Sequence, residues 1–298
     1  MKNIRMKWKI ILPMVCILTL LVIIMTIFYS LRLSRYTNIL FNDNITVAAN
    51  GLKAFISECE YSTRVAAVYA TENADIIEAV HMQNTSEIIQ LLTNSLDLYH
   101  VDFFVVTDEN GVVIARTFTD DQGDSIKDQT NIQEALQGKV FTCIEEGTYA
   151  KVSVSTGAPV YKKGKLIGVL SAGIRFDRNE TLDLLKEHYN ADFSVIYRGT
   201  RIATTIFKED NRITGTPLDP VMMERFQENQ EEYFGNADVL NENYSAFYMP
   251  LLNNRGEVFA LIFAGYSNAK LIVEKNAILK SVALIGLSGL IVSIIILL

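Results

Sequence analysis

The amino-acid sequence predicts an α+β protein, in which a long N-terminal helix precedes two tandem antiparallel-sheet units and a transmembrane helix lies at each end. Three observations support this fold class. Charge-free apolar segments lie at both ends of the chain, and the first continues into a segment with helical periodicity. Two runs of short strands then repeat the same landmarks about 90 residues apart.

Apolar segments of transmembrane character lie at both ends of the 298-residue chain. Ile10 to Ser30 contains no charged residue, and a helix of that length extends about 30 Å, which is the thickness of a bilayer core. Ser281 to Leu298 is also free of charge. We expect one transmembrane helix over residues 10–31 and a second within residues 273–298, where a helix from Asn268 to Ile278 continues into the apolar end.

Basic residues predict the orientation of the chain in a bacterial cell membrane. The tail of residues 1–9 is more basic than the other flank of the first span, which carries Arg32 and Arg35. The positive-inside rule then places the N-terminus in the cytoplasm and residues 32–275 outside, in the periplasm or extracellular space. The alternative is a cleaved signal peptide, but the apolar core is long for one and Tyr29–Arg32 is a poor cleavage site.

The segment between the two spans is acidic. Residues 32–269 hold 20 cationic and 33 anionic side chains, a net charge of about −13. This charge disfavours nucleic acid and anionic lipid headgroups as partners, because both bind basic patches. Cys59 and Cys143 are far apart in the sequence, and whether they pair as a disulfide stays open.

The residues after the first span predict helices. Residues 32–80 contain no proline and one glycine, Gly51, and their apolar residues recur at helical intervals. We expect one long helix that breaks near Thr71–Asn73. A further helix is expected over 85–98, with Thr85 or Asn84 as its N-cap.

The pattern then changes to strands. Two β-branched runs, 101–107 and 112–117, flank the turn residues Asp108–Gly111 and predict a hairpin. A short helix is expected near 132–136, and further strands are expected over 141–145, 148–155, 158–161 and 166–175.

The remainder of the chain repeats this layout. Asp102-Phe103 corresponds to Asp192-Phe193 at an offset of 90 residues, and Ala172-Gly173 corresponds to Ala264-Gly265 at an offset of 92. A nearly constant offset indicates two similar units of about 90 residues each.

These motifs resemble Cache domains, the PAS-like extracellular sensor modules of bacterial chemoreceptors, sensor kinases and cyclases. The resemblance is carried in the first unit by Val105–Thr117, Gly123–Ile126, Ala135–Gly138 and Ala158–Val160, and in the second unit by Thr200–Ile206, Arg212–Thr216 and Tyr248–Leu251. It implies a double Cache arrangement, with a long helix and membrane-distal unit over residues 32–178 and a membrane-proximal unit over residues 179–272.

The resemblance also implies a function. Such a sensor belongs to a methyl-accepting chemotaxis receptor in most cases, and the alternatives are a histidine kinase or a cyclic-dinucleotide enzyme. In the family, a HAMP linker and an output domain follow the second span, and residues 1–298 include neither. A chemotaxis adaptor and kinase would be partners of that output domain. The resemblance further implies a homodimer through the first helix, whose apolar stripe is compatible with one.

No catalytic or metal-binding motif is present, so we expect a binding protein that needs no cofactor rather than an enzyme. The three histidines, His81, His100 and His188, are scattered, and neither a nucleophile elbow nor a phosphate-binding glycine loop occurs.

The candidate ligand is a small carboxylate or an amino acid. The groove beside the sheet holds the ligand in PAS-like sensors, and an arginine fork recognises a carboxylate. The predicted ligand-binding residues of the first unit are Arg116, the alternating residues Tyr149, Lys151 and Ser153, and the helix residues Tyr61 and Tyr69. The alternative for each is a structural role.

A second candidate pocket is expected in the second unit. Its predicted lining residues are Arg201, Thr204, Thr205, Arg212 and Thr216. Here the structural alternative is favoured, because threonine is common in strands and an arginine often connects loops. A ligand-free, membrane-anchored structural protein is the remaining hypothesis for the whole chain, and it predicts a solid outer domain.

Overall fold

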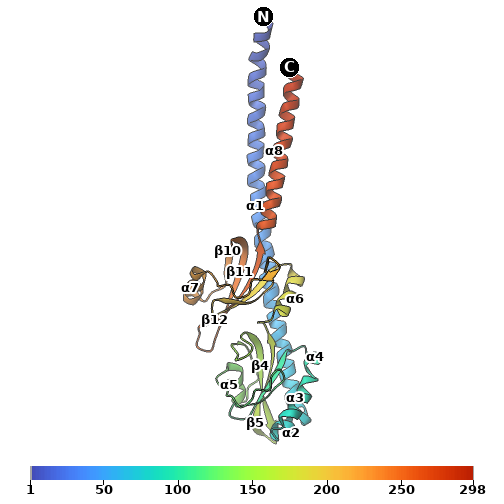
Figure 1. Ribbon diagram of the computed structural model, residues 1–298, viewed down its shortest axis with the longest axis vertical. Helices are drawn as coiled ribbons and strands as arrows, with labels where there is room; N and C mark the ends of the chain where they lie inside the picture. The colour runs from blue at the N-terminus through green and yellow to red at the C-terminus, as the bar shows by residue number, and fades with distance from the viewer. Residues whose placement is uncertain (1, 298) are drawn as a thin grey trace. The chain divides into compact units, whose positions relative to one another are not determined.

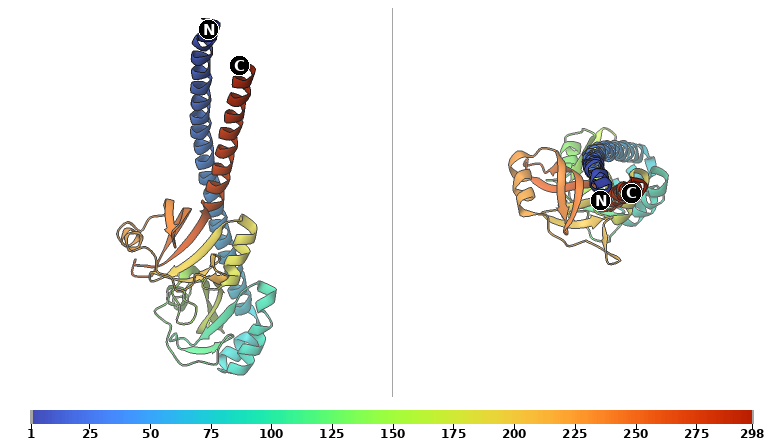
Figure 2. Two further views of the ribbon diagram at one scale, coloured as in Figure 1. Left: turned by 45° about the horizontal axis from the view of Figure 1, so that its top comes forward. Right: turned by 90° about the horizontal axis from the view of Figure 1, so that it is seen from above.

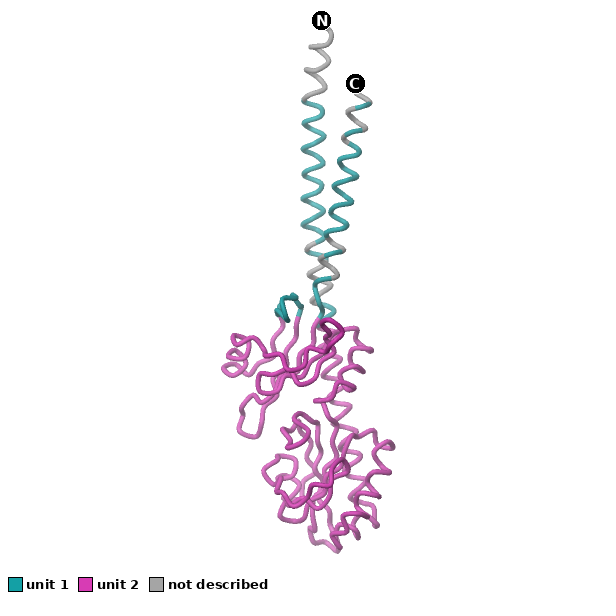
Figure 3. Tube along the Cα trace, in the orientation of Figure 1, with its two compact units in different colours: residues 1–45, 236–245, 266–298 teal, residues 46–235, 246–265 magenta. Residues whose placement is uncertain are grey.

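The structure is a computed structural model that describes residues 2–297, with side chains described at 13–33, 35–36, 43–269, 273, 276–289, 291 and 295. The chain forms two compact units (Figure 3). One comprises residues 1–45, 236–245 and 266–298, and the other comprises residues 46–235 and 246–265. The second of these contains most of both β-sheets and the candidate site.

The helical part agrees with the sequence prediction. Helix α1 spans Lys2–Glu72 and α2 spans Ala74–His81, so the predicted break is confirmed. At that break the side chain of Asn73 accepts hydrogen bonds from the backbone N–H groups of Asp75 and Ile76, which caps α2.

The helix predicted over 85–98 forms as two pieces. Helix α3 spans Thr85–Thr93, with Asn84 as its N-cap, and α4 spans Leu96–Tyr99. Helix α4 ends at His100, which has a left-handed backbone conformation with φ of 52°.

The first sheet is antiparallel and has the strand order β2-β1-β5-β4-β3. Helices α1, α2 and α3 lie on one of its faces and α5, Thr130–Leu136, lies on the other (Figures 1 and 2). The strands are β1 Phe103–Thr107, β2 Val113–Arg116, β3 Phe141–Glu145, β4 Ser153–Lys162 and β5 Lys165–Arg175.

Alternation along the strands divides this sheet between two cores. Phe104 and Leu170 are fully buried with the residues of α1, α2 and α3. Their neighbours Phe103 and Val169 point to the opposite face, where they pack with residues of α5 such as Ile132. The α5 face therefore contains an apolar cluster beside which polar groups gather, as described below.

The second sheet has the strand order β10-β11-β12-β6-β7. Its strands are β6 Asp192–Tyr197, β7 Thr200–Thr204, β10 Tyr233–Val239, β11 Glu242–Leu252 and β12 Val258–Ser267. Helix α6, Asn179–Tyr189, contacts β6 and β7. Helix α7, Pro220–Asn229, is capped by Asp219, and a short ribbon pairs β8, Phe207–Lys208, with β9, Asn211–Arg212.

Strand pairing is similar in the two sheets. In the first sheet β1 pairs with β5, and the landmark Phe103 lies opposite Gly173. In the second sheet the equivalent strands β6 and β12 pair in the same antiparallel sense, but Phe193 lies opposite Ala264, so the register differs by one residue. The landmarks that repeat in the sequence therefore lie on the same two adjacent strands of each sheet.

One strand prediction is wrong at its start. The strand expected from Thr148 begins at Ser153, and β4 then continues without a break through Pro159 to Lys162. Residues 148–152 form a loop instead, in which the N–H of Gly147 donates to the carbonyl of Ala150 at 2.9 Å.

Helix α8 spans Ala269–Leu297 and follows β12, as predicted. Among the described residues, one helical segment is long and apolar enough to cross a membrane: Pro13–Leu33 of α1, with 21 residues and a mean hydropathy of 2.6. The apolar part of α8 that the structure describes, Asn276–Gly289, is shorter. Most side chains of residues 290–298, in the predicted second span, lie outside the described residues.

Candidate ligand-binding site

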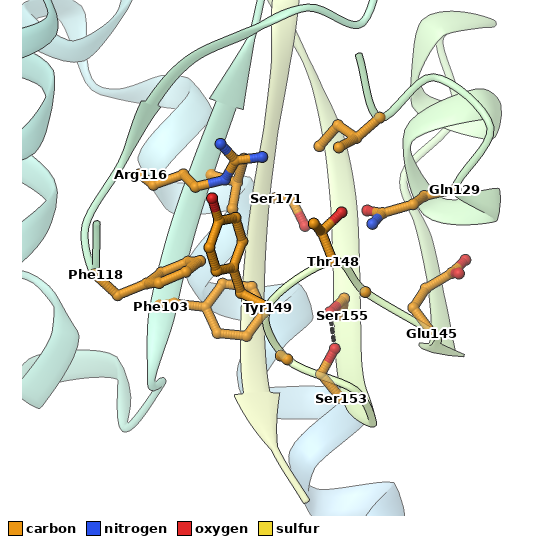
Figure 4. Close-up of a pocket in the computed structure, with 14 residues that line it drawn as sticks. Phe103, Arg116, Phe118, Gln129, Glu145, Thr148, Tyr149, Ser153, Ser155 and Ser171 are labelled. Atoms are coloured by element: carbon orange, nitrogen blue, oxygen red, sulfur yellow. Dashed lines mark hydrogen bonds between the residues drawn. The ribbon is translucent and has the colours of Figure 1, made fainter. Parts of the chain in front are cut away.

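A small cavity lies on the α5 face of the first sheet, at the predicted residue Arg116 (Figure 4). Its volume is about 40 Å³. It is lined by residues of all five strands of this sheet and of the loops after β2, before α5 and before β4, namely Phe103, Val105, Arg116, Phe118, Ile126, Gln129, Glu145, Gly147, Thr148, Tyr149, Ala150, Ser153, Ser155 and Ser171.

The sheet positions these side chains by its two-residue alternation. Ser153 and Ser155 are two residues apart on β4, and both point to the cavity. Ser171 of β5 lies opposite Gly157 of β4, and therefore on the same face. All three serines are buried, with at most 4% of each residue exposed.

Arg116 is the cation that lines the cavity. It is the last residue of β2 and its side chain is only 3% exposed. Its Nη1 and Nη2 donate to the two carboxylate oxygens of Asp124 at 2.8 and 2.7 Å, and Nη1 also donates to the carbonyl of Asp121 at 2.7 Å. The hydrogen bonds from Arg116 hold the pKa of Asp124 below its usual value.

Aromatic rings form one wall. The guanidinium carbon of Arg116 lies 5.2 Å from the ring centre of Tyr149, a cation–π geometry. The ring of Phe118 contacts both Tyr149 and Phe103 edge-on, at 5.8 and 5.5 Å between centres. The hydroxyl of Tyr149 donates to Asp121, and this hydrogen bond raises the pKa of Tyr149.

Hydroxyl and carboxylate groups form the opposite wall (Figure 4). The hydroxyls of Ser153 and Ser155 are 3.0 Å apart, and Asn131 of α5 donates to the hydroxyl of Ser171 at 2.9 Å. Glu145, at the end of β3, accepts a hydrogen bond from the backbone N–H of Asn131 at 3.2 Å. The cavity thus presents a cation on one side and hydroxyls with a carboxylate on the other, an arrangement that suits a small polar molecule.

The sequence prediction missed several lining residues. The strand alternation that identified Ser153 also predicts Ser155, so the sequence contained the signal for this residue. Ser171 and Glu145 come from strands that the sequence does not show to be neighbours. Phe118 lies in the loop after β2, where no periodicity applies.

Three predicted residues lie outside the cavity. Tyr61 and Tyr69 of α1 are 71% and 58% exposed, and Tyr69 stacks on Tyr99 at 6.3 Å. Both therefore belong to the outer surface of α1. Lys151 lies in the loop before β4, so it does not share a strand face with Ser153 as predicted. Its Nζ donates to the carbonyl of Thr148 at 2.8 Å.

The predicted residues of the second unit form an internal hydrogen-bond network. Arg201 is buried and donates to the hydroxyls of Ser194 and Thr216 at 3.0 and 2.8 Å. The hydroxyl of Thr204 lies 2.7 Å from that of Ser194, and the hydroxyl of Thr205 donates to Asp192 at 3.0 Å.

Arg212 has a similar role at the surface. It forms a two-pronged ion pair with Asp183 at 2.7 and 3.0 Å and donates to the carbonyl of Thr204 at 2.6 Å. It thereby connects β9 to α6 and β7, in agreement with the structural alternative. The predicted residues of the second unit do not line the Arg116 cavity.

An aromatic cluster packs against the second sheet. Phe226 of α7, Tyr248 of β11 and Phe263 of β12 are buried, with 5.4 and 5.0 Å between the ring centres of successive pairs. Burial raises the pKa of Tyr248 to about 12. In the first sheet, by contrast, the wall opposite the rings consists of serines.

Cys59 and Cys143 are both free thiols. Cys59 is buried and Cys143 half-buried, and burial raises the pKa of each thiol, that of Cys59 to about 12. They are therefore neutral and unreactive at ordinary pH.

Several solved structures are similar to the chain. The ligand-binding domain of the Campylobacter jejuni chemoreceptor Tlp3, in complex with 4-methylisoleucine, has 18% sequence identity and a TM-score of 0.46, covering 79% of this chain and 92% of that one. The Vibrio cholerae LuxQ periplasmic domain has 13% identity and a TM-score of 0.49, covering 76% and 99%. The Vibrio cholerae histidine kinase DctB sensor domain has 9% identity and a TM-score of 0.45, covering 80% and 98%.

The comparison of sequences gives a family for part of the chain. No curated protein matches the chain. Residues 174–278, which run from the end of β5 through the second sheet into α8, match the family model described as single Cache domain 3. The resemblance to Cache sensor domains is therefore confirmed for residues 174–278.

Proposed function

We propose that the chain is the sensor portion of a transmembrane receptor, and that it binds a small carboxylate or an amino acid outside the cell at the Arg116 cavity. One observation carries this proposal: a buried guanidinium and three buried serines line the same cavity of the first sheet, in a chain whose residues 174–278 match a Cache family model. A guanidinium fork suits a carboxylate, while Glu145 on the opposite wall suits an ammonium group.

Binding requires an exchange at Arg116. The cavity of 40 Å³ has room for about three water molecules, so an amino acid needs more space than the structure provides. Asp124 already compensates the guanidinium, but its own side chain is 45% exposed. A ligand carboxylate that replaces Asp124 keeps Arg116 paired and releases the segment 117–124 from the cavity. The ligand would then favour the arrangement in which this loop is displaced.

A direct route leads from the cavity to the second sheet. Glu146 follows the lining residue Glu145 and accepts hydrogen bonds from the hydroxyl of Tyr197 at 2.6 Å and from Arg198 at 2.6 and 3.1 Å. Tyr197 ends β6, which pairs with β12, and β12 continues into α8. A ligand that contacts Glu145 is therefore connected through Glu146 and Tyr197 to β6, which pairs with the strand that precedes α8, and we expect a coupling of about 1–3 kcal/mol between the two regions.

Calorimetry of the full chain in lipid nanodiscs tests this proposal. We expect at least one compound from a panel of amino acids and short-chain carboxylates to bind with saturation. Arg116→Ala should weaken that binding by about tenfold or more, because a charge-assisted hydrogen bond contributes about 1.5–3 kcal/mol. Arg212→Ala is the matched control, since Arg212 forms the same type of ion pair outside the cavity. Equal losses in both variants, or no binding by any compound, would contradict the proposal.

The alternative of a ligand-free structural protein has one observation in its favour. Arg116 is already paired with Asp124, and the cavity is small. This alternative predicts that no member of the panel binds and that Arg116→Ala affects stability alone.

We propose two spans and an external sensor, with the N-terminus in the cytoplasm. Pro13–Leu33 supplies the first span, and the charge-free segment 281–298 at the end of α8 supplies the second. The coding sequence after residue 298 distinguishes the outputs. A long helical hairpin there indicates a chemotaxis receptor, whereas an ATP-binding domain indicates a histidine kinase.

We also propose a homodimer through α1. Val47, Tyr61 and Tyr69 are each more than half exposed and lie within about 40° of one direction around the helix axis. Tyr61→Glu should lower the dimer fraction measured by light scattering, since it would bury a charge in the interface. Tyr161→Glu, at an exposed tyrosine of β4, is the control. An unchanged dimer in the Tyr61 variant would exclude this surface.

A further inference from the structure

A second and larger cavity lies away from Arg116. Its volume is about 630 Å³, which is within the range of small-molecule sites. It is lined by α1, by β3, by the segment after α7 and by the end of β11, with Lys53, Ile56, Ser57, Glu60, Cys143, Ile144, Gln230, Glu232, Met249, Pro250, Leu251 and Leu252 as its residues. It shares no residue with the Arg116 cavity.

The lining is apolar with few charges. Ile56 and Leu251 are buried, and Ile144, Met249 and Pro250 are half-buried. These side chains form an apolar surface. The transfer of a hydrocarbon or aromatic group from water to this surface lowers the free energy. Cys143 adds a neutral thiol to this wall, because burial raises its pKa.

The charges of the cavity differ in how they are paired. Lys53 binds both carboxylate oxygens of Glu232 at 2.7 Å, and it also faces the ring of Phe247 at 5.5 Å, so its positive charge is compensated. Glu60 is half-buried one helical turn from Ile56. Among residues 43–269, where side chains are described, no hydrogen bond or ion pair to the carboxylate of Glu60 is found. The cavity therefore carries one uncompensated negative charge.

We propose that this cavity binds a small organic cation, an amine with an apolar body. Its ammonium group pairs with the carboxylate of Glu60, and its body lies against Ile144, Met249 and Pro250. This occupant supplies the positive charge that would pair with Glu60 and an apolar body that matches the apolar lining. The site is separate from the proposed carboxylate site, so the two predictions succeed or fail independently.

Calorimetry with the full chain in lipid nanodiscs tests this site, using 2-phenylethylamine, its neutral analogue 2-phenylethanol and the anion phenylacetate. Empty nanodiscs correct for partition into lipid. We expect the amine to bind with saturation and about tenfold tighter than the alcohol, with phenylacetate weaker still. Binding of the amine should be unchanged in Arg116→Ala, because Arg116 lines the other cavity.

Variants at Glu60 supply the decisive comparison. Glu60→Gln should lower the affinity for the amine to that for the alcohol, and Glu60→Lys should reverse the preference in favour of phenylacetate. Glu58→Gln is the matched control: Glu58 is an exposed glutamate of the same helix, about 200° away around the axis, and it does not line the cavity. Amine binding that is absent in the wild type, or that survives both Glu60 substitutions in folded protein, would overturn the proposal.

Discussion

At the residue scale, the Arg116 site depends on how a buried charge is compensated. The Arg116 side chain is 3% exposed, so an uncompensated guanidinium there would be costly. Asp124 provides the compensation through a two-pronged contact, and Tyr149 faces the same guanidinium. A ligand that replaces Asp124 must therefore compensate the charge of Arg116 as well as Asp124 does, and this requirement selects carboxylates over neutral molecules.

The ion pair predicts a pH dependence of stability. The pKa of Asp124 is lowered in the folded protein by its hydrogen bonds to Arg116, so the ionised form is favoured on folding. This stability is complete above the unfolded pKa of about 3.9 and is lost as the pH falls through the lower folded pKa. Because Asp124 is partly exposed, the contribution is on the order of 1 kcal/mol.

Thermal unfolding of Asp124→Asn and wild type checks this dependence. We expect the variant to be less stable at pH 5–7, and the difference to shrink as the pH falls below about 4. Asp120→Asn, in the same loop, should show neither effect, because no hydrogen bond or ion pair of its side chain is described among residues 43–269. A stability difference that is constant down to pH 2 would contradict the role of the ion pair.

At the element scale, α1 and α6 approach each other at Gly51. A Cβ atom placed on Gly51 would lie 2.3 Å from the ring of Tyr189, the last residue of α6, so the glycine makes room for this ring. Glycine in a helix interior costs about 1 kcal/mol relative to alanine. The contact therefore explains why position 51 of this helix is a glycine.

A double-mutant cycle tests this contact. Gly51→Ala alone should destabilise the protein by about 1 kcal/mol or more, because the ring must shift. In a Tyr189→Ala background the same substitution should stabilise by up to about 1 kcal/mol through helix propensity. Thermal melts of the four proteins measure the sign change. If Gly51→Ala changed stability in the same direction in both backgrounds, the Tyr189 ring would not be the cause of the destabilisation.

Much of the element order follows from the sequence, for identifiable reasons. Asn73 and Asn84 are N-caps, and their side chains mark helix starts that periodicity alone leaves uncertain. The hairpin at Asp108–Gly111 follows from its turn chemistry, since Gly111 has φ of 78° and Asp108 accepts from the N–H groups of Asn110 and Val112.

The candidate site was less predictable, because it depends on strand order. Arg116 was identified by its chemistry, but Ser171 and Glu145 join it only because β5 lies between β1 and β4, and this order is not encoded locally. Tyr149 reaches the cavity from a loop rather than from the strand that was predicted there. Tyr61 and Tyr69 were selected as aromatics, although helical position determines that they face outward.

At the scale of the whole molecule, hydrogen bonds connect the Arg116 cavity of the first sheet with the second sheet, which α8 follows. Glu146, next to the lining residue Glu145, accepts from Tyr197 and Arg198, and Asn254 donates to the carbonyl of Asp128, next to the lining residue Gln129, at 3.0 Å. Hydrogen exchange should show that the carboxylate ligand changes the protection of the β6–β7 turn, residues 197–200. In Glu146→Gln this change should be smaller. Glu78→Gln is the control, because it removes an ion pair with Lys162 and touches neither Tyr197 nor Arg198. Equal changes in both variants would exclude Glu146 as the connection.

In the proposed topology the β-sheet body lies outside the cell and the N-terminal tail lies inside. Labelling with a membrane-impermeant maleimide, in spheroplasts of cells that express the full chain, tests it most directly. Native thiols label slowly, since burial raises the pKa of Cys59 and Cys143, and they are replaced by serine together with Cys16. We predict that Lys163→Cys, in the β4–β5 turn, labels in intact spheroplasts and that Lys2→Cys labels only after lysis. Labelling of Lys163→Cys only after lysis would contradict the account.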